Sequence, residues 1–159
     1  MSNPELEVSI DFIETFRVAG LSGRYDPSNF IRLNELWKAF AARASFIGRV
    51  GDGETCGVFR ERDPASQSFE HLAGARVDSE STPEGLEVWT LPARRYLKFK
   101  QTLTTGELYP QVAAAQAEIW GKRLPASGHK VAAAPDFQIY PANFSVGPSG
   151  SIEYYIPLE

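Results

Sequence analysis

The segment DFQIYP, residues 136–141, alternates apolar and polar side chains in a way that is typical of a β-strand. Successive side chains of a strand point to opposite faces of a sheet. Phe137 and Ile139 are therefore expected on one face, and Gln138 and Tyr140 on the other. A strand of this kind buries its apolar face readily. Its second face is either a solvated surface or part of a ligand site.

Two segments of the chain have helical periodicity. In Phe30–Phe46 and again in Leu108–Leu124, apolar residues recur three and four positions apart. A strand-like run precedes each of these helices, and two more follow it, separated by turn-rich segments. Each half of the chain, about residues 5–80 and about residues 86–159, is thus predicted as strand, helix, strand, strand.

Counterpart positions in the two halves, such as Val58 and Gln138, are about 80 residues apart. Because residue identity between the halves is slight, a chance arrangement is the alternative to duplication. We predict one α+β domain over residues 1–159, in which a duplicated strand-helix-strand-strand unit has pseudo-twofold symmetry. Each half would pack one main helix on an antiparallel sheet. A groove between two such halves is a natural place for a ligand.

Composition argues against several classes of function. The net charge is −4 without a basic stripe, which disfavours direct binding of nucleic acid. One cysteine excludes an intrachain disulfide, and two histidines without metal-ligand spacing argue against a metal site. No apolar run approaches the roughly 20 residues that span a bilayer. Without a signal-peptide pattern either, we expect a cytoplasmic protein with no cofactor and no membrane contact.

Further motifs extend over nearly the whole chain. They are LNELWKAFAAR (33–43), CGVFRE (56–61), FEHLAGARV (69–77), LEVWTLPARRYLKF (86–99), IWGKRLPASGH (119–129), PDFQIYP (135–141) and IEYYIPL (152–158). In this order and spacing they resemble the GyrI-like small-molecule-binding domain, also called the bacterial transcription activator effector-binding domain. That family serves as the sensor of multidrug-responsive transcription regulators and as stand-alone proteins. The resemblance implies a ring-lined pocket between the halves, with an acidic residue at its base, for bulky aromatic and often cationic ligands.

The chain departs from the family pattern at the base of this implied pocket. Gln138 stands where the family usually has a glutamate, so the amide keeps the length and hydrogen-bonding reach but loses the charge. A neutral ligand is then favoured, unless Asp136 or Glu153 supplies the charge. Glu70 and Glu153 lie on counterpart strands. They would form a site for a ligand cation only if both pointed inward. Cys56 replaces a common family tyrosine, and we interpret it as a small packing residue.

Aromatic and hydrogen-bonding residues are the candidates for ligand contact. They are Gln138, Tyr140, Tyr155, Trp37, Phe40, Tyr96, Trp89, His71 and Trp120. Core packing is the competing interpretation for the tryptophans and for Phe40, and a structural role is the competing one for His71. Tyr154 and Tyr155 have opposite parity, so both cannot face one cavity.

The leading functional hypothesis is a stand-alone protein that binds hydrophobic aromatic molecules without catalysis. A protein partner, either a regulator or a target enzyme, is left open. The alternatives are a hydrolase of strained electrophilic natural products and a protein inhibitor like the gyrase-inhibitor branch of the family. No catalytic residue is assigned, because Gln138 cannot act as a general base and Asp136, Glu153 or His71 would have to replace it.

Overall fold

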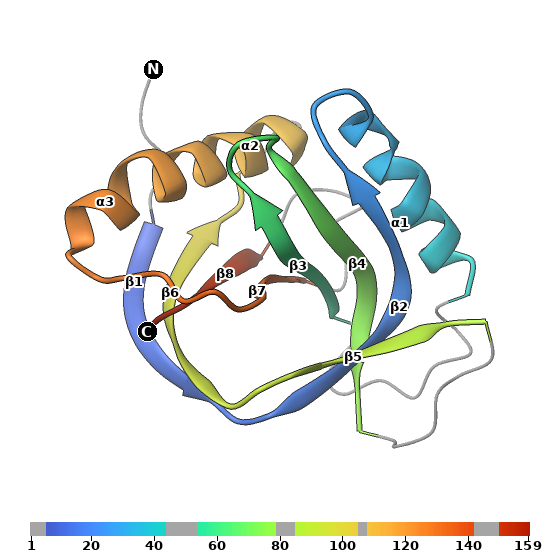
Figure 1. Cartoon of the computed structure of the whole chain (residues 1–159), viewed down its shortest axis with the longest axis horizontal. Coiled ribbons are helices and arrows are strands. Elements are labelled where there is room, and N and C mark those ends of the chain that lie inside the picture. The colour runs from blue at the N-terminus through green and yellow to red at the C-terminus, as the bar shows by residue number, and fades with distance from the viewer. Residues whose placement is uncertain (1–5, 44–53, 79–84, 105–107, 142–149) are drawn as a thin grey trace.

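A computed structural model describes residues 6–43, 54–78, 85–104, 108–141 and 150–159 (Figure 1). Within these residues, eight strands form one antiparallel sheet in the order β1-β6-β8-β7-β3-β4-β2-β5. The strands are β1 (Leu6–Ile13), β2 (Phe16–Tyr25), β3 (Thr55–Asp63), β4 (Ser68–Val77), β5 (Glu87–Leu91), β6 (Arg94–Thr102), β7 (Asp136–Tyr140) and β8 (Ser151–Pro157). The helices are the short 3-10 turn η1 (Phe30–Arg32), α1 (Leu33–Ala41), α2 (Leu108–Glu118), the π-helical turn η3 (Ile119–Arg123) and α3 (Leu124–Ser127).

The α+β class is confirmed, and each half contains one strand more than predicted. Along the chain the order is β1-β2-α1-β3-β4 and then β5-β6-α2-β7-β8. The extra strands β1 and β5 are the two edges of the sheet. The halves also share a single sheet instead of having one sheet each, because β3 pairs with β7, β1 with β6 and β2 with β5. If the labels of β1–β4 are exchanged with those of β5–β8, the same strand order is obtained when read from the other edge of the sheet. The predicted duplication with pseudo-twofold symmetry stays a prediction.

Both helical segments form close to where their periodicity predicts. α1 follows a turn in which the Asp26 carboxylate accepts hydrogen bonds from the Ser28 backbone and hydroxyl. Residues 44–46 of the predicted first helix lie outside the described residues. The second helix runs on through η3 and α3, and it stops at Gly128, whose φ of +76° suits glycine.

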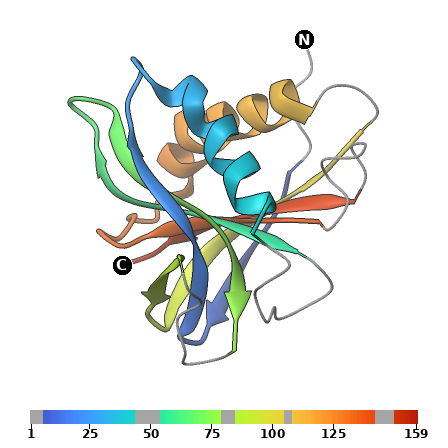
Figure 2. The same ribbon diagram turned by 90° about the vertical axis from the view of Figure 1, so that its right-hand side faces the viewer.

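The helices cover only one face of the sheet, which we call the helix face (Figure 2). Under α2, η3 and α3 this face buries Leu97, Phe99, Ile152, Tyr154 and Ile156, among others. Under α1 it buries Ala19, Ala73, Ala75 and Val77 against Phe40. The opposite face has its own apolar cluster, built from Phe16, Val18, Cys56, Val58, Leu72, Trp89, Leu91, Tyr96, Phe137, Ile139 and Tyr155. The sheet therefore separates two distinct sets of aromatic residues.

Candidate functional site

Strand β7 lies near the middle of the sheet, and all five of its side chains are buried. Phe137 and Ile139 belong to the cluster on the opposite face, whereas Tyr140 packs on the helix face. The predicted alternation of this strand is confirmed. Gln138 shares the parity of Tyr140 and is only 3% exposed, so a long amide is held on the helix face in the protein interior.

Rings from four elements meet beside Gln138 on the helix face. This central aromatic cluster consists of Trp37 from α1, Phe59 from β3, Phe69 and His71 from β4, and Tyr140 from β7. The Trp37 ring lies 5.5 Å from Tyr140 and 5.8 Å from His71 between centroids. Phe59 lies 4.3 Å from His71 and 5.4 Å from Phe69. These separations are those of aromatic pairs in contact.

Gly57 is the position on β3 that allows the rings to approach one another over the sheet. It pairs with Gln138 on one side and Ala73 on the other. A Cβ at this position would lie 3.0 Å from His71, 3.2 Å from Trp37 and 3.3 Å from Tyr140. These distances are shorter than ordinary van der Waals contacts, so the three rings close over Gly57 and leave no room for a side chain there.

Two hydrogen bonds join uncharged polar groups of the cluster and the adjacent Gln138. The Tyr140 hydroxyl donates to Oε1 of Gln138 at 2.5 Å, and the indole N–H of Trp37 donates to Nε2 of His71 at 3.2 Å. Burial, with a smaller contribution from the nearby charge of Arg62, lowers the pKa of His71 to about 3. His71 is therefore a neutral acceptor, and Gln138 adds no charge beside it.

An ion pair lies next to the aromatic cluster on the same face. Nε and Nη2 of Arg62 donate to Oδ1 and Oδ2 of Asp136 at 2.7 and 2.8 Å, the bidentate geometry typical of arginine and carboxylate. The guanidinium also lies over the rings of Phe59, Trp120 and Phe69, at 4.6, 4.9 and 5.7 Å. Burial raises the pKa of Asp136, and Arg62 opposes that effect.

Arg62 was not predicted as a site residue, because regular alternation along β3 places it with Arg60 on the opposite face. The strand contains a β-bulge, in which Glu61 and Arg62 together stand opposite the single residue Phe69 between two regular pairs of β3 and β4. Glu61 adopts a φ of +53°, which is uncommon for a residue other than glycine. The bulge reverses the alternation and turns Arg62 onto the helix face. Nothing in the sequence around it signals this irregularity.

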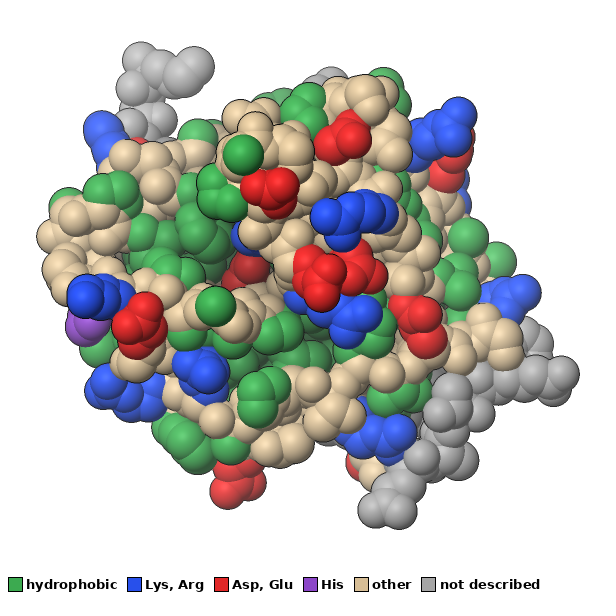
Figure 3. Space-filling view, in the orientation of Figure 1, with side chains coloured by type: hydrophobic (Ala, Val, Ile, Leu, Met, Phe, Trp, Pro, Cys, Tyr) green, Lys and Arg blue, Asp and Glu red, His purple; other side chains and the backbone are tan. Residues whose placement is uncertain are grey.

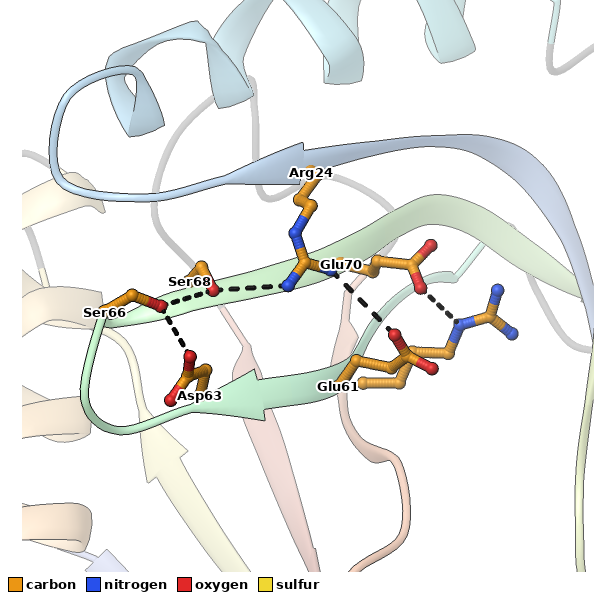
Figure 4. A network of polar contacts seen from close by, with 7 residues as sticks. Arg24, Glu61, Asp63, Ser66, Ser68 and Glu70 are labelled. Atoms are coloured by element: carbon orange, nitrogen blue, oxygen red, sulfur yellow. Dashed lines mark hydrogen bonds and ion pairs between the residues drawn. The ribbon is translucent and has the colours of Figure 1, made fainter.

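A surface network holds the hairpin that carries the bulge (Figure 4). Arg24 of β2 lies 3.9 Å from the Glu61 carboxylate and donates to the Ser68 hydroxyl at 3.3 Å. At the hairpin turn, Ser66 donates to Asp63 at 2.9 Å and lies 2.8 Å from Ser68. The Glu61 carboxylate is thus directed toward Arg24 of β2 (Figure 4).

Three of the predicted ligand-binding residues lie on the other side of the sheet. Tyr155 stacks on Phe137 at 4.5 Å, and Tyr96 contacts the same ring at 5.1 Å. Trp89 is buried in that cluster, with the guanidinium of Arg60 over its ring at 3.6 Å. The sheet separates these three from Gln138 and Tyr140, so the nine predicted residues do not form one site. On β8 it is Tyr154, paired with Gln138, that faces the helices.

The remaining predicted residues lie on the helix face in different surroundings. Trp37 and His71 belong to the central aromatic cluster, and Trp120 of η3 contacts it through Arg62. Phe40 is 1% exposed and packs in the core under α1, with its ring 6.2 Å from Trp37. The structure therefore brings Gln138, Tyr140, Trp37, His71 and Trp120 to one side, while Phe40 lies behind Trp37.

The two strand glutamates do not place a charge beside Gln138. Glu70 lies 3.4 Å from Nε of Arg60, and Glu153 lies 3.0 Å from Nζ of Lys98. Both side chains point to the opposite face of the sheet, because each glutamate is two residues from a member of the apolar cluster on that face. Of the three acids considered from the sequence, Asp136 alone lies on the same face of the sheet as Gln138.

The molecular surface also has separate hydrophobic and charged regions. Figure 3 shows a hollow with hydrophobic side chains below α2 and α3, and charged side chains of both signs gather beside it over the β3–β4 hairpin. Among the described residues, no group of three or more His, Cys, Asp or Glu side chains could hold a metal ion. No helix in the same part of the chain is long and apolar enough to cross a membrane.

The single antiparallel sheet with helices on one face, together with the match to a family model, makes the chain a GyrI-like effector-binding domain, the class that the sequence motifs predicted. Within this class, the chain belongs to the Cass2 family, described as integron-associated effector binding protein, whose model matches residues 9–158. The transcriptional regulator BrlR of Pseudomonas aeruginosa is 27% identical over 129 residues, which are 79% of this chain and 46% of the regulator. The chain thus spans about half the length of this curated relative.

Solved structures share the fold at low sequence identity. An integron cassette protein from the mobile metagenome of Vibrio cholerae has a TM-score of 0.72 at 21% identity, covering 96% of this chain and 95% of its own. SAV2435, solved with bound tetraphenylphosphonium, has a TM-score of 0.76 at 14% identity, covering 96% and 94%. The C-terminal domain of EcmrR has a TM-score of 0.61 at 14% identity, covering 97% and 98%. At these identities the likeness establishes the fold.

Proposed function

We propose that this protein binds bulky aromatic small molecules, without catalysis, on the helix face between α1 and η3. The central aromatic cluster is the observation that carries the proposal, because rings from four elements meet there around the buried polar side chains Gln138 and His71. A flat or propeller-shaped ligand would gain contact area and edge-to-face contacts with these rings. Family membership and the tetraphenylphosphonium complex of SAV2435 support this class of ligand.

The floor of the proposed site favours a neutral ligand that can form a hydrogen bond. Gln138 and His71 are both uncharged, and the charge of Asp136 is compensated by Arg62. The Gln138 amide oxygen accepts the Tyr140 hydroxyl, and the amide nitrogen of the same side chain can donate to an acceptor on the ligand. A hydrogen bond between the ligand and this buried amide would contribute to affinity.

Binding can be measured by tryptophan fluorescence and thermal shift, since Trp37 and Trp120 border the site. We expect wild type to bind neutral triphenylphosphine oxide more tightly than tetraphenylphosphonium. Gln138→Glu should gain affinity for the cation, whereas the control Gln67→Glu, in the exposed β3–β4 turn, should behave as wild type. If no member of a broad aromatic panel changes the fluorescence or the melting temperature of wild type, the proposal is wrong.

Hydrolysis of a strained electrophile is the second candidate, since a hydrolase from Listeria innocua shares the fold with a TM-score of 0.54 at 11% identity. The residues that would have to replace the family glutamate are poorly suited as general bases. Asp136 is bound to Arg62, Glu153 lies on the opposite face, and His71 has its pKa lowered to about 3 by burial. Turnover of an epoxide panel that is lost in Asp136→Asn or His71→Gln would nevertheless establish this activity.

Inhibition of another protein is the remaining alternative, and it needs a partner surface instead of a ligand site. A pull-down with purified gyrase, compared with a bait that lacks this chain, separates it from small-molecule binding. Retention of gyrase together with a failure to bind any aromatic compound would favour the inhibitor.

A further inference from the structure

We infer that Arg62 is a resident cation that sets the charge preference of the proposed ligand site, and that the site selects against lipophilic cations as long as Arg62 remains paired with Asp136. This inference rests on the proposed function, because it concerns which ligands the aromatic cluster accepts. It assigns the selectivity for ligand charge to Arg62, a residue other than Gln138.

The first observation is what the guanidinium contacts. Aromatic faces attract cations within about 6 Å of the ring centroid. Arg62 lies within this range of Phe59, Phe69 and Trp120, which belong to β3, β4 and η3. The protein's own side chain thus already provides these rings with a positive charge. A ligand cation at the same rings would have to displace Arg62 or bear the repulsion between two like charges.

The second observation is the pairing of the buried carboxylate. Asp136 is 4% exposed, and both of its oxygens accept hydrogen bonds from Arg62. A buried carboxylate needs a partner, because an isolated charge in the interior is strongly unfavourable. The carboxylate that could hold a ligand cation is therefore already neutralised. Removing one member of the pair should leave the charge of the other for a ligand.

The third observation is that the backbone holds Arg62 in this position. The bulge at Glu61 turns Arg62 to the helix face, whereas the exposed Glu61 carboxylate itself lies 3.9 Å from Arg24 of β2. Bulges are a common means of redirecting one side chain beside a functional site. The orientation of Arg62 is thus part of the fold of the β3–β4 hairpin.

Two probes of matched shape and opposite charge test the inference, namely tetraphenylphosphonium and tetraphenylborate. The measured quantity is the ratio of their dissociation constants, taken relative to the ratio in wild type so that intrinsic differences between the probes cancel. The variants are Arg62→Gln, which keeps a hydrogen bond to Asp136 without the charge, Asp136→Asn, and the double variant, which removes both charges. Melting temperatures are recorded for all four proteins.

We expect Arg62→Gln to shift the ratio toward the cation by about tenfold or more, and Asp136→Asn to shift it toward the anion by a similar factor, as one uncompensated charge near the ligand requires. The double variant should return to the wild-type ratio. If Arg62→Gln fails to fold, Asp136→Asn and the double variant still decide. Ratios that stay at the wild-type value in every folded single variant overturn the inference. Absence of binding by both charged probes and by neutral triphenylphosphine oxide to all four proteins would instead overturn the proposed function.

Discussion

Acidification should destabilise this protein because His71 is buried in its neutral form. The side chain is 1% exposed, and burial lowers its pKa to about 3 from the ordinary value of 6.5. Its Nε2 accepts the indole N–H of Trp37, which a protonated ring cannot do. Below about pH 6.5 the unfolded chain therefore binds a proton at His71 that the folded protein excludes. Stability is fully present above that pH and is lost as the pH falls toward about 3.

The magnitude follows from proton linkage. With a folded pKa of about 3 and an unfolded pKa of about 6.5, lowering the pH from 7 to 5 reduces the free energy of unfolding by about 2 kcal/mol. A loss of this size is a large part of the stability of a typical small domain. It should be measured by urea unfolding at pH 7, 6 and 5, followed by tryptophan fluorescence.

Two variants isolate the contribution of this histidine. His71→Gln retains an acceptor for the Trp37 N–H but does not titrate, so its loss of stability between pH 7 and pH 5 should be smaller than that of wild type by about 2 kcal/mol. The control His129→Gln changes the exposed histidine and should retain the wild-type pH dependence. Equal losses in wild type and His71→Gln would refute the reasoning.

Three further predictions concern the two faces of the sheet. Gly57→Ala should crowd three rings of the central aromatic cluster, lower the free energy of unfolding by about 1–3 kcal/mol and weaken the binding of aromatic ligands, as measured by urea unfolding and by titration. Unchanged affinity would show that ligands do not depend on the arrangement of these rings. Cys56 is 1% exposed and burial raises its pKa to about 12, so its thiol should react with Ellman's reagent only after denaturation, and rapid reaction of the native protein would contradict this. Tyr140→Phe removes the hydroxyl bonded to Gln138 and should reduce ligand affinity severalfold, whereas Tyr155→Phe on the opposite face should not; an equal effect of both would place the ligand elsewhere.

The elements that sequence reasoning found are those whose pattern is local. The alternation of β7 and the periodicity of α1 and α2 depend only on neighbouring residues, and the structure contains each of them. β1 was missed although it alternates, because Val8, Ile10 and Phe12 are 46–62% exposed at the edge of the sheet and the segment is not part of a buried core. Edge strands satisfy half of their backbone groups with solvent, and their sequences are correspondingly less constrained by packing.

The site was predicted only in part, because its composition depends on which strands become neighbours. Gln138 and Tyr140 share a strand, and their parity was sufficient to place them together. Tyr155 was favoured over Tyr154, but the pairing of β7 with β8 sets Tyr154 opposite Gln138 and leaves Tyr155 on the other face. A shift of one residue reverses every side chain of a strand, so parity within one strand cannot decide its parity relative to another.

By itself, the sequence determined the α+β class, the family and the alternation of β7. The tertiary structure alone decided that Arg62 would neutralise Asp136. That contact joins residues 74 positions apart, and it exists because a bulge at Glu61 reverses the side-chain order of β3. Periodicity reports which face a residue takes while a strand is regular. Where the backbone departs from regularity, only the packed sheet fixes which charges meet.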